Sequence, residues 1–163
     1  MRFKGMTLVA SAVVLGACGG GEKAPEAAAP AAAPAAAPVA ATAGTAAPIT
    51  GTMHEVKMIG DAKGYRYEPA EITAKAGDGI KFVMESGGPH NVAFVASAIP
   101  AESKAQLDAN FGTDKMGELS SGLKMNPGES FTLSLGGLVA GKYEFNCTPH
   151  LAMNMKGVLT ITP

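Results

Sequence analysis

Apolar and polar side chains alternate along much of the chain from residue 51 onward, and this alternation most restricts the folds open to it. Segments 80–84, 131–135 and 143–147 each place an apolar residue at every second position, as strands with one face in a core do. Turns containing glycine or proline separate these segments. We therefore predict an all-β sandwich of about eight short strands with one short helix over residues 101–111. A helix bundle is excluded, and a small open barrel is the alternative architecture.

The N-terminal end has the pattern of a bacterial lipoprotein signal. Arg2 and Lys4 form a basic start, and the apolar run 6–15 is too short to span a bilayer. Segment 15–18, with the sequence Leu-Gly-Ala-Cys, resembles a lipobox, in which the cysteine is lipidated and becomes the new N-terminus. We predict lipidation of Cys18, with an ordinary cleaved signal as the alternative.

Alanine, proline and glycine dominate residues 19–50, in which Ala-Ala-Ala-Pro units recur. The regularly spaced prolines remove N–H donors and clash with the preceding turn, so a helix is excluded, and small side chains cannot form a core. We predict a signal peptide over residues 1–18, a disordered, extended linker over residues 19–50, and one folded domain over residues 51–163.

The two cysteines of the chain have different expected roles. If Cys18 carries lipid, Cys147 has no partner for a disulfide within the chain. An unpaired thiol in an exported protein is expected to be buried, reactive or bound to a metal.

Residue types that bind transition metals occur near Cys147 and upstream of it. Cys147 and His150 are three residues apart, and His90 follows a Gly-Gly-Pro turn. Met153 and Met155 come shortly after His150. One Cys, two His and a weakly bound Met form the ligand set of a blue-copper electron-transfer site. Zinc is disfavoured because a fourth strong ligand is missing, and a catalytic Cys–His pair is disfavoured because it leaves the methionines unexplained.

Three motifs are spaced along the domain: Tyr-Glu-Pro at 67–69, Gly-Pro-His-Asn at 88–91, and Gly-Lys-Tyr-Glu-Phe-Asn-Cys-Thr-Pro-His at 141–150. With these motifs, residues 52–163 resemble the cupredoxins of the plastocyanin, pseudoazurin and amicyanin group. The resemblance implies an eight-stranded Greek-key sandwich with one type 1 copper ion near one end. It also implies a set of site residues: the copper ligands His90, Cys147 and His150, the axial ligand Met155 with Met153 as the alternative, and Asn91, which joins the two ligand loops.

The resemblance further implies a carrier that shuttles single electrons between redox proteins and is not an enzyme. An exposed ring edge of His150 would be the point at which electrons enter and leave. A bacterial cytochrome, oxidase or reductase is the expected partner. We also expect a monomer, exported to the periplasm or the surface of a cell-envelope membrane and held there by its N-terminal lipid.

Other functions remain as alternatives or are excluded. A periplasmic copper chaperone or storage lipoprotein is the main alternative. A copper-dependent oxidase or nitrite reductase is disfavoured, because the three histidines of the chain cannot build a second copper site. The formal net charge of −1 argues against a nucleic-acid partner, which requires a strongly basic face.

Overall fold

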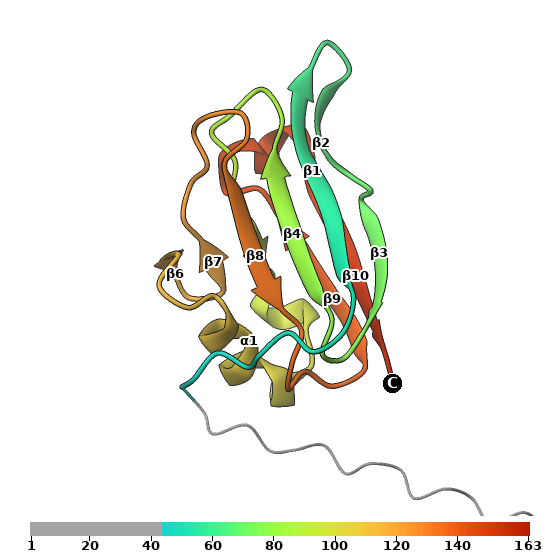
Figure 1. Ribbon diagram of the computed structural model, residues 1–163. Helices are drawn as coiled ribbons and strands as arrows, with labels where there is room; N and C mark the ends of the chain where they lie inside the picture. Colours follow the sequence, from blue (N-terminus) through green and yellow to red (C-terminus); the bar gives the residue numbers. More distant parts are fainter. Residues whose placement is uncertain (1–43) are drawn as a thin grey trace, which may run out of the picture. The chain divides into compact units, whose positions relative to one another are not determined.

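The computed structural model describes residues 44–163, which form two β-sheets packed against each other (Figure 1). The strands are β1 Met53–Asp61, β2 Gly64–Glu68, β3 Glu71–Lys75, β4 Gly79–Met84, β5 Ala93–Phe94, β6 Lys115–Gly117, β7 Ser120–Ser121, β8 Ser130–Ser134, β9 Gly141–Asn146 and β10 Lys156–Thr162. The helical segments are η1 Ala96–Ala98, η2 Ala101–Ser103, α1 Lys104–Asn110 and η3 Thr148–Met153.

The strand order confirms the predicted all-β Greek-key sandwich. One sheet has the order β2-β1-β4-β8 and the other the order β3-β10-β9-β5-β7-β6, so the chain crosses repeatedly between the sheets. Most neighbouring strands are antiparallel, and β1 with β4 and β10 with β3 are parallel pairs. The helix expected at 101–111 is also confirmed, since η2 and α1 together cover residues 101–110.

Ten strands are present in residues 44–163, somewhat more than the eight or so that the sequence predicted. The difference comes from the short strands β6 and β7, which have three and two residues. An alternation of period two needs a longer segment to be recognised, so these strands leave no pattern in the sequence.

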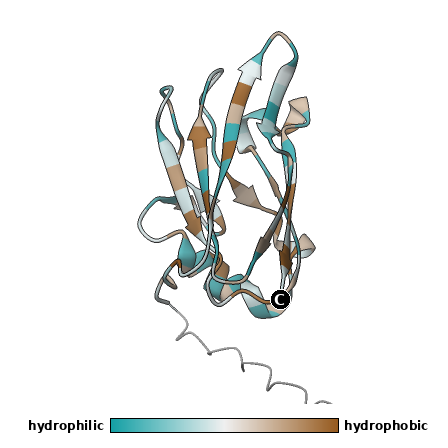
Figure 2. Cartoon of the chain, turned by 45° about the vertical axis from the view of Figure 1, so that its right-hand side comes forward, coloured by the Kyte–Doolittle hydropathy of each residue, from teal (hydrophilic) through white to brown (hydrophobic). Residues whose placement is uncertain are grey.

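The core lies between the sheets and follows from the alternation along the strands, which Figure 2 shows as bands of hydrophobic and hydrophilic residues. In β4, for example, Phe82 and Met84 are buried whereas Lys81 is exposed. The ring of Phe82 packs edge-on against Tyr67 and Phe145, with centroids 6.1 and 5.6 Å away. Burial of such a side chain contributes about 1.5–3 kcal/mol, so the alternating positions stabilise the sandwich directly.

Residues 44–52 form a strap that is bound to the end of the sandwich where α1 lies. The N–H of Ala47 donates to Asn110 Oδ1 at 2.9 Å, and the N–H of Thr50 donates to the carbonyl of Gly77 at 2.9 Å. The last residues of the tract that the sequence assigned to a linker are therefore hydrogen-bonded to the folded domain.

The predicted signal peptide 1–18 with Cys18, and residues 19–43 of the predicted linker, lie outside the described residues. Within the part of the chain that the structure describes, no helix has the length and apolar character that crossing a bilayer requires.

Pairing between β5 and β9 brings the two halves of the predicted metal site together. Ala93 in β5 pairs with Asn146, the last residue of β9. His90 lies just before β5 and Cys147 just after β9, so this register places them next to each other. His90 is held further by two backbone hydrogen bonds with Lys124, of 3.0 and 2.7 Å.

Candidate metal centre

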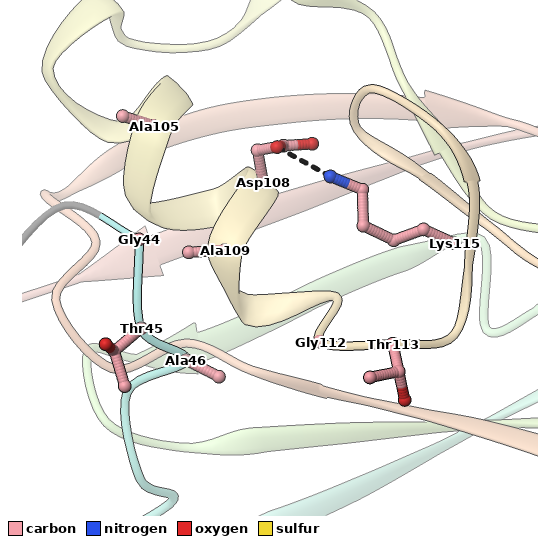
Figure 3. A pocket seen from close by; sticks show the side chains of 9 residues that line it. All are labelled: Gly44, Thr45, Ala46, Ala105, Asp108, Ala109, Gly112, Thr113 and Lys115. Carbon is pink, nitrogen blue, oxygen red and sulfur yellow. Dashed lines mark hydrogen bonds and ion pairs between the residues drawn. The ribbon is translucent and has the colours of Figure 1, made fainter.

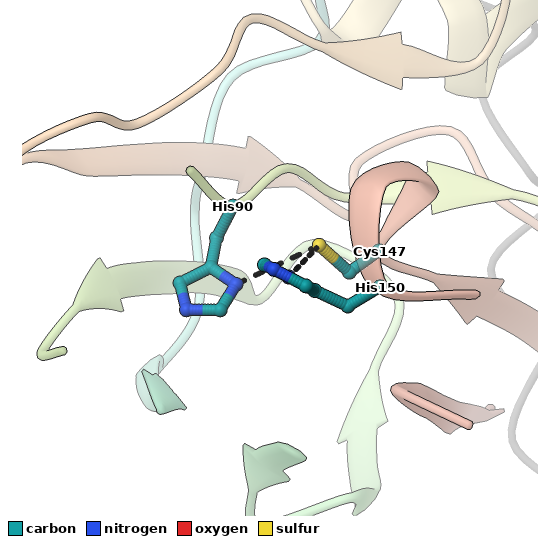
Figure 4. A group of neighbouring side chains, drawn as sticks. All are labelled: His90, Cys147 and His150. Carbon is teal, nitrogen blue, oxygen red and sulfur yellow. Dashed lines mark hydrogen bonds between the residues drawn. The ribbon is translucent and has the colours of Figure 1, made fainter. Parts of the chain in front are cut away.

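Three buried side chains, those of His90, Cys147 and His150, converge in the loops that follow β4 and β9 (Figure 4). Cys147 Sγ lies 3.6 Å from His90 Nδ1 and 3.4 Å from His150 Nδ1. The ligand atoms of the three residues all lie within 4.8 Å of one another. The structure thus brings together the three strong ligands that the sequence singled out.

The separations within this cluster fit one shared transition-metal ion. An ion ~2.3 Å from a thiolate sulfur and ~2.0 Å from an imidazole nitrogen, at near-tetrahedral angles, separates the two ligand atoms by ~3.5 Å. The sulfur–nitrogen distances of 3.4 and 3.6 Å agree with that value. A soft thiolate combined with two imidazoles is a donor set that suits copper.

A hydrogen bond to the main chain sets the orientation of the His90 ring. Its Nε2 lies 2.8 Å from the carbonyl oxygen of Ser86, and since a carbonyl only accepts, Nε2 carries the proton. The other nitrogen, Nδ1, therefore presents its lone pair towards Cys147. Such an outer hydrogen bond fixes both the tautomer and the plane of a metal-binding histidine.

Burial shifts the pKa of each of the three groups towards its neutral form. Desolvation lowers the pKa of His90, and desolvation together with the neighbouring His90 lowers the pKa of His150. Desolvation also raises the pKa of the Cys147 thiol, although the backbone N–H groups of Asn91 and His150 oppose this by hydrogen bonding to it. Both imidazoles are thus ready to bind a metal, whereas the thiol must release a proton when it does so.

Asn91 is fully buried and connects the two loops that carry the ligands. Its Oδ1 accepts a hydrogen bond of 2.8 Å from the N–H of Thr148, and its Nδ2 donates to Thr148 Oγ1 at 3.2 Å and to Ser120 Oγ at 3.1 Å. Asn91 follows His90, and Thr148 follows Cys147, so the Asn91 side chain joins the residue next to one ligand to the residue next to another.

The two candidate axial methionines differ in burial. Met155 is fully buried, whereas Met153 is 54% exposed. The main chain of Met155 is also bonded to both neighbouring ligands: its N–H donates to the His150 carbonyl at 3.2 Å, and its carbonyl accepts from the Cys147 N–H at 3.0 Å. The choice of Met155 as axial ligand stays a prediction, and its burial favours it over Met153.

Tyr65 is a residue of the site that sequence reasoning missed. Its ring is stacked on the His150 imidazole, with the centroids 3.8 Å apart and the planes 14° from parallel. His150 is only 6% exposed, less than expected for a ring edge at which electrons enter and leave. The sequence held a partial signal for Tyr65: it lies two positions before Tyr67, which belongs to the Tyr-Glu-Pro motif, so both side chains point to the same face of a strand. Strand periodicity does not say which loop that face meets, so the contact with His150 could not be predicted.

A hollow beside α1 shares no residue with the metal centre (Figure 3). Lys115 and Asp108, which form an ion pair of 2.6 Å, are among its lining residues, and small side chains form most of its walls. Its lining residues are Gly44, Thr45, Ala46, Ala105, Asp108, Ala109, Gly112, Thr113 and Lys115.

Comparisons with known proteins find similarity to copper-binding proteins. The family described as "Copper binding proteins, plastocyanin/azurin family" matches residues 54–162. The chain is 35% identical over 117 residues to a plastocyanin of Prochlorothrix hollandica, covering 72% of this chain and 79% of the relative. It is 37% identical over 107 residues to a chloroplastic plastocyanin of Physcomitrium patens, covering 66% of this chain and 56% of the relative. Among solved structures, oxidized plastocyanin from Dryopteris crassirhizoma shares 32% identity, with 66% of this chain and 99% of that chain covered and a TM-score of 0.49.

Proposed function

The chain belongs to the plastocyanin/azurin family of copper-binding proteins, and on that premise we propose that it shuttles single electrons between redox proteins at the bacterial cell envelope. Family membership makes it a type 1 blue copper protein and an electron carrier rather than an enzyme, as predicted. The observation that carries the proposal is the buried cluster of His90, Cys147 and His150, whose sulfur and nitrogen atoms are spaced for one ion.

Copper supplies an ion with two oxidation states one electron apart, and the protein supplies a rigid, dry set of ligands for it. Cys147 and His150 are held on one short loop, and His90 is bound to it through the Asn91–Thr148 hydrogen bonds. Ligands fixed by the fold move little when the charge of the site changes, and fast electron transfer requires that small rearrangement. In our proposal Met155, the buried methionine, is the weak axial ligand.

The visible spectrum tests the carrier directly. We expect Cu(II) added to the full chain to produce an intense thiolate-to-copper band that bleaches with ascorbate, and we expect the Cys147→Ser protein to lack that band. A band that survives Cys147→Ser, or no band in the wild-type protein, contradicts the proposal. A colourless site that takes up Cu(I) and exchanges it readily would favour the copper chaperone or store instead.

Anchoring to a membrane is proposed from residues 1–18 and is independent of the copper site. The apolar run after Arg2 and Lys4, followed by the lipobox-like end at Cys18, supports export and lipidation. We expect the mass of the mature N-terminus to include lipid on Cys18, and the Cys18→Ser protein to move from the membrane fraction to the soluble fraction. An unmodified mature N-terminus would overturn this part of the proposal.

Docking of a redox partner is proposed at the surface next to His150. Leu151 and Met153, which follow it in η3, are 45% and 54% exposed. Exposed apolar side chains beside a redox centre suit brief, weak encounters with a cytochrome, oxidase or reductase.

A further inference from the structure

Tyr65, in strand β2, packs its ring against the histidines of the metal centre. It lies flat on His150 at a centroid separation of 3.8 Å and meets His90 edge-on at 6.1 Å. Tyr65 is only partly buried, whereas His150, on which its ring is stacked, is 6% exposed. One side chain of β2 therefore contacts two of the copper ligands.

Gly60 in β1 makes room for this ring. Gly60 pairs with Tyr65 across the β1–β2 hairpin. A Cβ atom at position 60 would lie 2.6 Å from Tyr65 Cε1 and 2.9 Å from the Cα atom of Gly87, closer than side chains tolerate. The ring is thus confined between the glycine of the hairpin and the imidazole of His150.

The same hairpin also supports the other histidine. The carbonyl of Ser86 accepts hydrogen bonds of 2.8 Å from the Gly60 N–H and 2.8 Å from His90 Nε2. Ser86 Oγ in turn donates to the carbonyl of Gly60 at 3.1 Å. The His90 ring is oriented by this carbonyl, whereas the His150 ring, whose Nδ1 faces Cys147, is covered by Tyr65.

We propose that Tyr65 is a positioning residue of the copper site, which holds the plane of the His150 imidazole and keeps water from it. This inference rests on the proposed copper-carrier function. Because the imidazole can rotate about its Cβ–Cγ bond, a flat aromatic contact on its face keeps Nδ1 directed at the position shared with Cys147. Exclusion of water disfavours the more highly charged cupric state, so the ring also raises the reduction potential.

The test compares variants at position 65 in the full chain. Tyr65→Ala removes the ring and admits water, Tyr65→Leu keeps apolar bulk without a stack, and Tyr65→Phe keeps the stack without the hydroxyl. We expect the alanine and leucine proteins to bind copper about two- to tenfold more weakly. This fold-change corresponds to the free energy that a stacked aromatic pair contributes. We expect a lower reduction potential for Tyr65→Ala, and wild-type values of both quantities for Tyr65→Phe.

A matched control lies next to Tyr65 in the same strand. Arg66 forms an ion pair of 2.9 Å with Asp61 in the β1–β2 hairpin, so Arg66→Gln disturbs the hairpin without touching the stack. We expect this variant to keep the wild-type potential and copper affinity. Equal shifts of the reduction potential in Arg66→Gln and Tyr65→Ala would overturn the proposal. It would also be overturned if Tyr65→Phe lowered the potential and the copper affinity as much as Tyr65→Ala.

A second measurement needs no copper. The ring current of Tyr65 should displace the NMR signals of the His150 ring protons in the apoprotein, and that displacement should persist in Tyr65→Phe and disappear in Tyr65→Leu. Unchanged signals in Tyr65→Leu would overturn the stack itself. If the wild-type protein forms no blue site, the carrier function fails, whereas the apoprotein spectra still decide whether Tyr65 orients His150.

Discussion

At the scale of single residues, the environment separates side chains of the same type. Met155 and Met153 are two positions apart in the sequence, yet one is fully buried and the other is largely exposed. His54 lies in β1 and pairs with Asp78 instead of a metal ligand. Residue type alone therefore limits the candidates for a site, and burial then selects among them.

The first prediction concerns the axial ligand. Because the axial thioether tunes the potential of a type 1 site, we expect Met155→Leu to shift the reduction potential by about 60 mV or more, equivalent to a tenfold change in a one-electron equilibrium. Met153→Leu is the matched control and should leave the potential close to that of the wild-type protein. Voltammetry of the two proteins checks this, and a large shift confined to Met153→Leu would reverse the assignment.

The second prediction concerns Asp78, whose carboxylate accepts hydrogen bonds from the N–H groups of Lys75 and Thr52 and from His54 Nε2. The bond from Lys75, then that from His54, then that from Thr52 lower its pKa to about 2. A carboxyl group with a lowered pKa in the folded state stabilises the fold above its ordinary pKa, and this contribution is lost as the pH falls towards about 2.

We therefore expect Asp78→Asn to be less stable than the wild-type protein at pH 6. Near pH 2 the free energies of unfolding of the two proteins should become similar. Denaturant unfolding across this pH range measures the difference. Glu71→Gln, which changes an exposed carboxylate in β3, serves as the control and should show no such dependence. A constant difference between wild type and Asp78→Asn at all pH values would contradict the explanation.

At the scale of elements, the strap is the segment whose contribution differs most from what its composition suggests. It is rich in small residues, yet its residues 44–51 form four hydrogen bonds to the domain, through Thr45, Ala47, Thr50 and Gly51. Its backbone also lies against Gly136, where a Cβ atom would be 2.8 Å from the carbonyl oxygen of Pro48. The strap is therefore held on the sandwich by hydrogen bonds and by close packing at Gly136.

The third prediction follows from these bonds. A chain that starts at residue 52 should be about 2–4 kcal/mol less stable than one that starts at residue 44, since each hydrogen bond contributes about 1 kcal/mol. Ala47→Pro in the full chain removes one N–H donor and should cause a smaller loss. Denaturant unfolding compares the three proteins, and equal midpoints would show that the strap does not stabilise the domain.

At the scale of the whole domain, the strap and the metal centre lie at opposite ends of β4 (Figure 1). The strap is bonded to Gly77, just before β4, and His90 comes after the end of that strand. Six residues of strand span ~20 Å.

The fourth prediction concerns the stability of the whole domain. The ligands come from two loops that meet at one end of the β5–β9 pairing, so an ion bound there joins segments that separate on unfolding. Copper at 100 times its dissociation constant should stabilise the fold by about 2.7 kcal/mol and raise Tm by about 10 °C. Calorimetry with and without copper checks this, and Cys147→Ser should abolish the increase. Equal Tm values for the wild-type protein in both conditions would contradict it.

The sequence by itself determined the fold class and the three strong copper ligands. Alternation in segments such as 80–84 and 143–147 is a local property, because successive side chains of a strand point to opposite faces. The ligand chemistry is also local, since a thiolate and an imidazole three residues apart in one loop can reach one ion. The β-sandwich and the cluster of His90 with Cys147 and His150 were accordingly predictable without coordinates.

The tertiary structure alone decided the contacts between segments that are distant in the chain. The stack of Tyr65 on His150, the burial of Met155 and the attachment of the strap at Gly77 each depend on how two sheets and their loops pack. Strand periodicity says that a side chain faces inward but not which side chain it meets there. That partner is set by the strand order and by the register between strands, which only the folded chain establishes.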